Sequence, residues 1–194
     1  MNLKQKNTWV VGLTGSILSG KSTALDFFKK NGVFVLSADE IVARLYETPQ
    51  GQKKIITLFG TTDKQQIAQQ LFADTARKTE LEKILHPLVL KQACEQIRKN
   101  PVPLVVFEVP LLFEAGWDQL TDINIVVVAD KKTLPVRLKA RKMTLRTYRM
   151  RLKHQLPEAE KIKRADIVLF HKNKKELELK IKNLCKAFDL LKQN

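Results

Sequence analysis

The sequence has few cysteines and no long apolar run. Its two cysteines, Cys94 and Cys185, form no C-x-x-C pair and have no histidine at metal-ligand spacing. A disulfide framework and a zinc site are therefore not expected, and a reducing compartment fits best. The apolar stretch from Trp9 to Leu13 is too short for the hydrophobic region of a signal peptide or for a membrane span. We expect a cytoplasmic protein without a membrane partner.

Acidic residues are scarce relative to basic ones. The 35 lysines and arginines outnumber the 20 aspartates and glutamates, which gives a formal net charge of +15. Such a field favours polyanionic partners such as nucleic acids, anionic lipids or phosphorylated metabolites, but the charge alone does not choose among them. Aromatic residues make up only 7% of the chain and are not interleaved with a basic patch. Because stacking aromatics are a usual part of single-strand binding sites, we do not expect a nucleic-acid partner.

Apolar runs of strand length indicate the fold class. The fractions of apolar residues, 44%, and of charged residues, 28%, are typical of a globular protein, and 194 residues suit one domain. Several runs are rich in Val and Ile and do not alternate with polar residues, as expected for strands of a parallel sheet covered on both faces. Helical patterns separate them, so the class is α/β with a five-stranded parallel sheet. The expected strands are Trp9 to Leu13, Val33 to Leu36, Leu104 to Val109, Ile123 to Val128 and Ile167 to Phe170.

Helical patterns fill the chain between these runs. Lys21 to Lys30 has apolar residues at helical spacing and stops at Asn31-Gly32, a good C-terminal cap. Residues 38–99 read as helical without a convincing strand, which predicts a helical insertion. Its helices are expected to break near Pro49-Gly51, Gly60 to Asp63 and His86-Pro87.

A second helical stretch is rich in arginine. Thr133 is expected to cap a helix that has Pro135 in its first turn. The basic helical pair that follows to His154 is a candidate lid. Arg137 and Arg141 are four residues apart, so on a helix they project from one face, as a clamp on a transferring phosphate requires. A solvated basic helix is the alternative.

The chemistry is carried by residues 15–22, which match G-x-x-x-x-G-K-[ST] at every fixed position and lie between an expected strand and an expected helix. In this context successive backbone N–H groups cradle phosphates at the positive end of the helix dipole. Lys21 would reach the β- and γ-phosphates of ATP, and the Ser22 hydroxyl would help to hold Mg²⁺. The residues expected to bind the nucleotide are Gly15, Leu18, Ser19, Gly20, Lys21, Ser22 and Thr23.

Two carboxylates follow expected strands. Asp39 comes just after the second strand, where ligands collect in open α/β sheets, so it is the candidate that orients or deprotonates the nucleophile. It equally suits the N-cap of a helix that begins near Glu40. Glu108 ends the third strand, where a P-loop protein often keeps an acidic residue near the metal. The alternative for Glu108 is an exposed strand end.

Several segments together resemble the dephospho-coenzyme A kinase family, and the similarity runs through most of the chain. Residues 11–23 resemble the family's opening L-T-G-G-I-G-S-G-K-S-T. Ala38-Asp39, with Ile41 and Arg44, is similar to its D-A-D-x-I-A-R. The other matching segments are Leu85-His86-Pro87-Leu88-Val89 and Val109-Pro110-Leu111-Leu112-Phe113-Glu114, followed by Arg137, Arg141, Arg151, Gln155, Lys161 and Ala165-Asp166.

The resemblance implies a P-loop core at about 1–40, 100–132 and 164–194, a helical substrate insertion at about 41–99 and a lid at about 133–163. It implies phosphate transfer from Mg·ATP to the ribose 3′-hydroxyl of dephospho-coenzyme A, the last step of coenzyme A biosynthesis. Asp39 would be the base, with Lys21 and Arg141 as the other catalytic residues and Ser22 and Glu108 at the metal. The residues implied to bind the acceptor are Asp39, Arg44, His86, Pro110, Leu111, Arg137 and Arg151.

The sequence departs from the family pattern at several positions. Ser16 and Leu18 replace glycines, which puts side chains on a loop where the backbone must approach phosphate closely. Ser37 stands where the family has an aspartate, and Lys142 follows Arg141 where the family has another. Phe170-His171 replaces the aspartate and asparagine that usually end the last strand.

Three alternatives to this function differ in class. A nucleoside or nucleotide kinase would share the core, but the L-H-P-L-V and V-P-L-L-F-E segments speak against it. A GTPase is disfavoured because no D-x-x-G follows the P-loop, although Asn173-Lys174-Lys175-Glu176 imitates a guanine-reading N-K-x-D. A basic nucleic-acid-binding protein with a vestigial P-loop would bind with an affinity that falls steeply with salt and would not turn over nucleotide.

Overall fold

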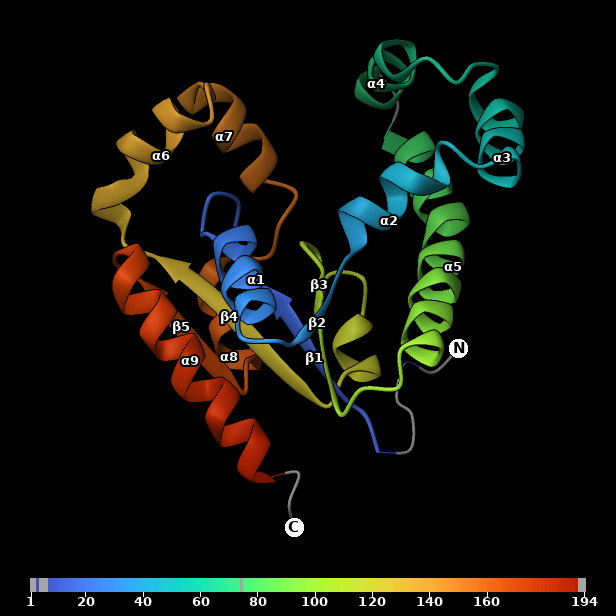
Figure 1. Ribbon diagram of the computed structural model, residues 1–194. Coiled ribbons are helices and arrows are strands. Elements are labelled where there is room, and N and C mark those ends of the chain that lie inside the picture. The colour runs from blue at the N-terminus through green and yellow to red at the C-terminus, as the bar shows by residue number, and fades with distance from the viewer. Residues whose placement is uncertain (1–2, 4–6, 74, 192–194) are drawn as a thin grey trace. The chain divides into compact units, whose positions relative to one another are not determined.

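The structure is a computed structural model that describes residues 3, 7–73 and 75–191 (Figure 1). The chain divides into two compact units. The sheet unit consists of Asn2–Leu36 and Pro101–Asn194, and the helical unit contains Ser37–Asn100. In the described part of the chain, no helix is long and apolar enough to cross a membrane.

The sheet has five parallel strands in the order β2-β3-β1-β4-β5 (Figure 1). The predicted fold class and all five strands are therefore confirmed. The central strand β1 pairs with β3 on one side and β4 on the other, with Leu13 opposite both Glu108 and Ile125. The strands are β1 (Trp9–Thr14), β2 (Phe34–Ser37), β3 (Leu104–Glu108), β4 (Ile123–Ala129) and β5 (Ile167–His171).

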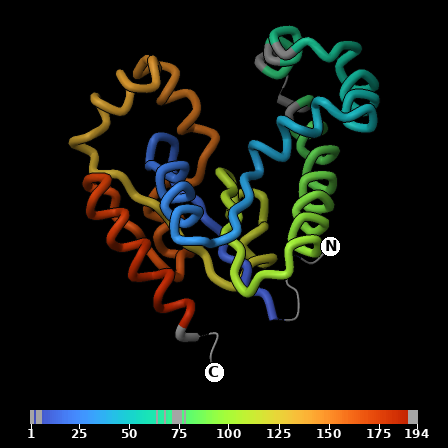
Figure 2. Tube along the Cα trace, viewed as in Figure 1, coloured from blue at the N-terminus to red at the C-terminus, as the bar shows by residue number. Residues whose placement is uncertain are grey.

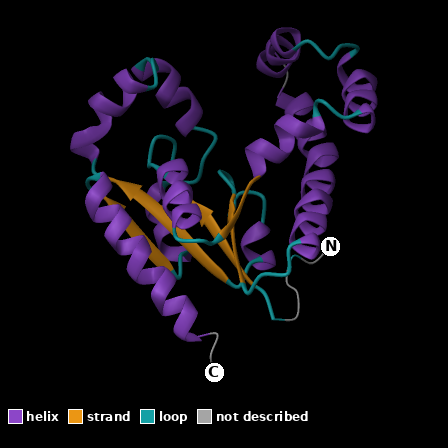
Figure 3. Cartoon of the chain, in the orientation of Figure 1, coloured by secondary structure: helices purple, strands orange, loops and turns teal. Residues whose placement is uncertain are grey.

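Helices cover both faces of this sheet (Figure 3). Side chains alternate between the faces of a strand, and β4 shows the consequence. Ile125 and Val127 belong to a core with residues of α1 (Lys21–Lys30) and α9 (Lys174–Leu191). Val126 and Val128 belong to a separate cluster with Phe113 and with Ile162 of α8 (Glu158–Arg164). The sheet unit thus has three layers, and the helix predicted for Lys21 to Lys30 is confirmed.

Between β4 and β5 the chain forms the helices of the predicted lid (Figure 2). After the short turn η2 (Lys131–Thr133), α6 (Leu134–Ala140) and α7 (Leu145–Leu152) precede α8. Thr133 precedes α6, but its hydroxyl makes no cap hydrogen bond and instead donates to the Asp130 carbonyl at 2.6 Å. Thr133 is the N-cap residue of α6 and Pro135 lies in the first turn, as predicted. The side-chain cap hydrogen bond is absent because Thr133 already ends the η2 turn and has helical dihedral angles.

The helical unit has its own apolar core, formed by Ile55, Phe59, Ile67, Leu81 and Leu85. Its helices are α2 (Ala38–Leu45), α3 (Pro49–Phe59), α4 (Lys64–Ala73) and α5 (Thr75–Lys99). The predicted break at Gly60 is confirmed, since Gly60 caps α3 with a φ of 71°.

The predicted break near Pro49-Gly51 is present between α2 and α3, whereas the break predicted at His86-Pro87 is wrong. Gly51 lies inside α3, where its backbone N–H donates to the Thr48 hydroxyl, so the break falls before Pro49. Pro87 lies inside α5 instead of ending it. A proline inside a helix costs about 3 kcal/mol. Here Leu85 and Val89 are buried on either side of it, and this packing favours the continuous helix over the local preference of proline.

Candidate active site

The loop after β1 requires glycine at two of its positions. Gly15 has a φ of 152°, and a Cβ atom there would lie 2.3 Å from the Val127 carbonyl oxygen. Gly20 has a φ of 102°, and its Cβ would lie 2.0 Å from Nδ1 of His171. A larger residue at either position would meet fixed neighbours in an unfavourable backbone conformation. Steric exclusion of a Cβ atom thus explains why the phosphate-loop pattern has glycine at these two positions.

Leu18, which replaces a glycine of the family pattern, also has a left-handed backbone, with a φ of 63°. A non-glycine residue in that region costs about 1–2 kcal/mol. The loop is closed by a hydrogen bond of 3.0 Å from the Ser19 N–H to the Ser16 carbonyl. Both serine side chains are buried, and in the described structure neither hydroxyl has a hydrogen-bond partner.

Lys21 follows the loop as the first residue of α1. Its ammonium donates to the carbonyl of Gly15 at 2.9 Å and to that of Ser16 at 3.2 Å. The cation is therefore held over the loop by the loop's own backbone. The first N–H groups of a helix have no intrahelical partner, so α1 presents donors and the positive end of its dipole at the same place.

Arg137 of α6 joins the loop to β5. Its Nη1 donates to the carbonyls of Leu18 and Ser19 at 3.0 and 3.1 Å, and its Nη2 donates to the His171 carbonyl at 3.2 Å. Its Nε donates to the Thr133 hydroxyl at 2.8 Å. Of the two arginines predicted to form a clamp, Arg137 thus lies against the loop, while Arg141 is exposed as the C-cap of α6.

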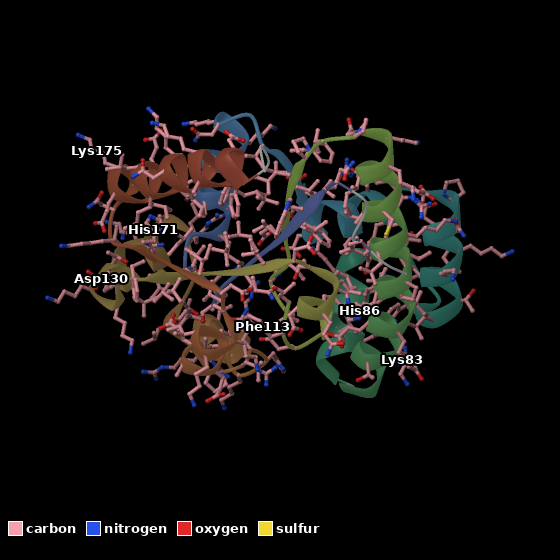
Figure 4. The ribbon with its side chains drawn as sticks, turned by 90° about the horizontal axis from the view of Figure 1, so that it is seen from below. Lys83, His86, Phe113, Asp130, His171 and Lys175 are labelled. Atoms are coloured by element: carbon pink, nitrogen blue, oxygen red, sulfur yellow. The ribbon has the colours of Figure 1, made fainter. Side chains whose placement is uncertain are left out.

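His171 lies beneath the loop, at the end of β5. Its Nδ1 is 3.1 Å from the Ser19 carbonyl and 3.3 Å from Nη1 of Arg137. Burial lowers the pKa of His171, and the Arg137 charge lowers it further, while the hydrogen bond to Ser19 opposes both. Figure 4 shows His171 on the same side of the sheet unit as Asp130, whose N–H donates to the His171 carbonyl. In the sequence, His171 is distinguished only by its departure from the family pattern.

Glu108 and Ser22 are the residues predicted to hold a metal. Glu108 ends β3 and is 5% exposed, so the alternative of an exposed strand end is wrong. Its pairing with Leu13 places it beside the strand that leads into the loop, and Ser22 lies exposed in the first turn of α1. Carboxylate and hydroxyl oxygens are ligands that suit Mg²⁺. The described residues contain no group of three His, Cys, Asp or Glu that could hold a metal.

A buried ion pair lies below the turn that contains Pro110 and Leu111. Nζ of Lys161 is 2.9 Å from Oε1 of Glu114, with the two side chains 0% and 17% exposed. The same Nζ donates to the Pro110 carbonyl at 3.4 Å, and the Thr14 hydroxyl donates to that carbonyl at 3.2 Å. No local feature of the sequence indicates that Lys161 is buried, because the neighbouring basic residues of α8, Lys163 and Arg164, are exposed.

In the helical unit, the residues predicted to bind the acceptor lie on two helices, two of them in α2 and one in α5. Asp39 and Arg44 are exposed on α2. Ser37 is the N-cap residue, so the alternative that Asp39 caps this helix is wrong. His86 is half-buried in α5 (Figure 4), where burial lowers its pKa and Glu82 opposes the shift. In the sheet unit, Arg151 is exposed on α7.

This chain belongs to the class of P-loop nucleotide-binding proteins. That class is defined by a strand, a glycine-containing loop that the lysine contacts, and a helix that begins directly after the loop. The sequence model of the dephospho-CoA kinase family matches residues 9–178. The dephospho-CoA kinase of Lactobacillus johnsonii is 35% identical over an alignment of 175 residues that covers 84% of this chain and 88% of that protein. The chain is therefore a member of the dephospho-CoA kinase family.

Solved structures agree with this assignment. A Thermus thermophilus protein of known crystal structure superposes with a TM-score of 0.85 and 32% identity, covering 94% of this chain and 98% of the other. The dephospho-CoA kinase from Campylobacter jejuni superposes with a TM-score of 0.64 and 27% identity, covering 94% of this chain and 99% of the other.

Proposed function

We propose that this protein transfers the γ-phosphate of ATP to the ribose 3′-hydroxyl of dephospho-coenzyme A, giving coenzyme A. The observation that carries the proposal is the P-loop geometry within a family match over residues 9–178. A phosphate-binding loop alone would suit any small-molecule kinase, whereas the match extends to the helical unit and to the Pro110 turn. A positive protein also suits an acceptor that carries a pyrophosphate.

The nucleotide would be bound at the sheet unit. N–H groups of residues 18–23 and the Lys21 ammonium would bind its phosphates, and Ser22 and Glu108 would hold Mg²⁺. Bound Mg²⁺ neutralises charge on the phosphate oxygens. Lys21 is already turned toward the loop by the carbonyls of Gly15 and Ser16, so the cation needs little reorganisation to meet a phosphate.

We propose acceptor roles for residues that match the family pattern. Asp39 is exposed on α2 and, as general base, would take the proton of the 3′-hydroxyl while the oxygen attacks the γ-phosphorus. The bond between the γ-phosphorus and the β,γ-bridging oxygen would break, and its electron pair would leave with ADP. Arg141 would stabilise the charge on the transferring phosphoryl group. Residues 41–99 would act as the substrate insertion and 133–163 as the lid. The further acceptor contacts that we propose are Arg44, His86, Pro110, Leu111, Arg137 and Arg151.

The test is ATP consumption by the purified protein with Mg²⁺, comparing dephospho-coenzyme A with adenosine, AMP and no acceptor. Mass spectrometry and NMR locate the added phosphate. Turnover specific to dephospho-coenzyme A with phosphate on the 3′-oxygen is the expected result. Turnover with adenosine or AMP instead would indicate a different small-molecule kinase. Absence of turnover together with strongly salt-dependent nucleic-acid binding would favour a vestigial P-loop.

The role of Asp39 has a separate test. Replacing it with asparagine removes the proton acceptor at nearly constant volume, and a positioned general base contributes about 10²- to 10⁴-fold to a rate. We expect Asp39→Asn to lower kcat by that order while ATP affinity changes little. Glu40→Gln, at the next exposed position of α2, is the matched control. An unchanged kcat in Asp39→Asn would show that another group accepts the proton.

A further inference from the structure

One P-loop N–H group is bound by a side chain that comes from the lid segment. The Ile17 N–H donates to Oε1 of Gln155 at 2.9 Å, across 138 positions of sequence. A backbone N–H can only donate, so the Gln155 amide must present its oxygen to the loop. Gln155 lies just after α7 and is half-buried, and neither residue is among those proposed to bind nucleotide.

Gln155 is held in place on both sides. Its own N–H donates to the Leu152 carbonyl at 3.0 Å, which continues the end of α7. The N–H of the next residue, Leu156, donates to Oε1 of Glu114 at 2.8 Å, and that same oxygen forms the buried ion pair with Lys161. The backbone around Gln155 is therefore anchored in the interior of the sheet unit.

The loop needs such support at the neighbouring residue. Leu18 has a φ of 63°, a conformation that glycine adopts freely and leucine does not. The Gln155 bond fixes the Ser16–Ile17 peptide, one residue before Leu18, and Arg137 fixes the Leu18 carbonyl on the other side at 3.0 Å. Two side chains from the lid segment thus flank the one loop residue whose backbone is unfavourable.

We propose that Gln155 is a positioning residue, which holds the loop at Ile17 and Leu18 in the conformation that binds the nucleotide phosphates. This inference rests on the proposed function, since it concerns the ATP site of the same reaction. Without the Gln155 oxygen the nucleotide-free loop relaxes toward conformations that relieve Leu18, and the apparent affinity falls with the fraction of competent loops. Once ATP is bound, the phosphates restore the conformation, so the chemical step is little affected.

The test uses Gln155→Met, which keeps the side-chain length and removes the acceptor. The Kd for Mg·ADP and the KM for ATP should rise by about 2- to 12-fold, the range that the net free energy of one hydrogen bond gives, with kcat nearly unchanged. Amide hydrogen exchange of Ile17, followed by NMR in nucleotide-free protein, should accelerate. Gln119→Ala, at an exposed glutamine of the sheet unit, should leave all four quantities as in the wild type.

Two further variants separate positioning from general stability. Gln155→Glu retains an acceptor oxygen, so Ile17 should stay protected from exchange. In a Leu18→Gly background, the Gln155→Met penalty on ADP affinity should shrink, because glycine needs no support in the left-handed region. An equal penalty in both backgrounds would overturn the link to Leu18.

The possible failures are distinguishable. If wild-type protein does not bind Mg·ADP, the proposed function is wrong and this inference falls with it. If wild type binds Mg·ADP and Gln155→Met binds it equally well, the inference alone is overturned. Unchanged exchange of Ile17 in Gln155→Met would also overturn it, because the hydrogen bond would then not protect the loop.

Discussion

Removal of Glu114 should destabilise the protein strongly, because it leaves the Lys161 ammonium buried without its carboxylate. The Lys161 side chain is 0% exposed and its Nζ lies 2.9 Å from Oε1 of Glu114. Breaking a buried ion pair by removing one partner costs about 3–5 kcal/mol. For a chain of this size, 1 kcal/mol shifts Tm by about 2–4 °C, so Glu114→Ala should lower Tm by about 6–20 °C.

The measurement is thermal and urea unfolding followed by circular dichroism. Glu160→Ala is the matched control, because Glu160 also pairs with a lysine at 2.9 Å, but on the surface. Its loss should leave Tm almost unchanged, since exposed pairs contribute little. Replacing Glu114 and Lys161 together by methionine should recover most of the lost stability. Equal effects of Glu114→Ala and Glu160→Ala, or no recovery in the double variant, would refute this reasoning.

Three further predictions concern the loop. Burial and Arg137 lower the pKa of His171, so the folded protein favours the neutral imidazole. The free energy of unfolding therefore keeps the full contribution of His171 above the unfolded pKa of about 6.5 and loses it as the pH falls below that value. Urea unfolding from pH 7 to pH 5 should therefore show a smaller loss of stability in His171→Asn than in wild type, and parallel curves would contradict this. Gly20→Ala should weaken Mg·ADP binding, measured by calorimetry, because the new Cβ would meet His171. The double variant Gly20→Ala, His171→Gly should recover ADP affinity only in part, since the φ of 102° stays unfavourable for alanine. Lys21→Ala should abolish ATP turnover with an unchanged circular dichroism spectrum, while Lys29→Ala, at the other end of α1, should stay active.

Local patterns in the sequence predicted the elements of the sheet unit well. Each of the five strands begins and ends within one residue of its expected position, and α1 spans the predicted residues Lys21–Lys30. Runs of β-branched residues and a glycine-containing cap are signals contained in a few consecutive residues, so no distant contact is needed to read them. The P-loop was recognisable for the same reason.

Predictions failed where tertiary packing competed with a local preference. Pro87 was expected to end a helix, but α5 continues through it because Leu85 and Val89 are buried on the same helix. Thr133 occupies the predicted N-cap position of α6, but its hydroxyl donates to the Asp130 carbonyl in the preceding turn instead of capping the helix. Proline can end a helix or lie inside one, and a threonine hydroxyl can cap a helix or bond to the turn before it. Neighbouring residues in space decide which of the two occurs.

The sequence by itself determined the order of strands and helices, the phosphate loop and the family, because those signals lie in consecutive residues. Only the tertiary structure decided how the loop is supported. Gln155 and His171 reach the loop across 138 and 152 positions, and Lys161 becomes a buried cation only where Glu114 meets it. A polar side chain in a basic, helical stretch has the same local pattern whether it faces solvent or a partner, so its role depends on which distant residues the fold brings beside it.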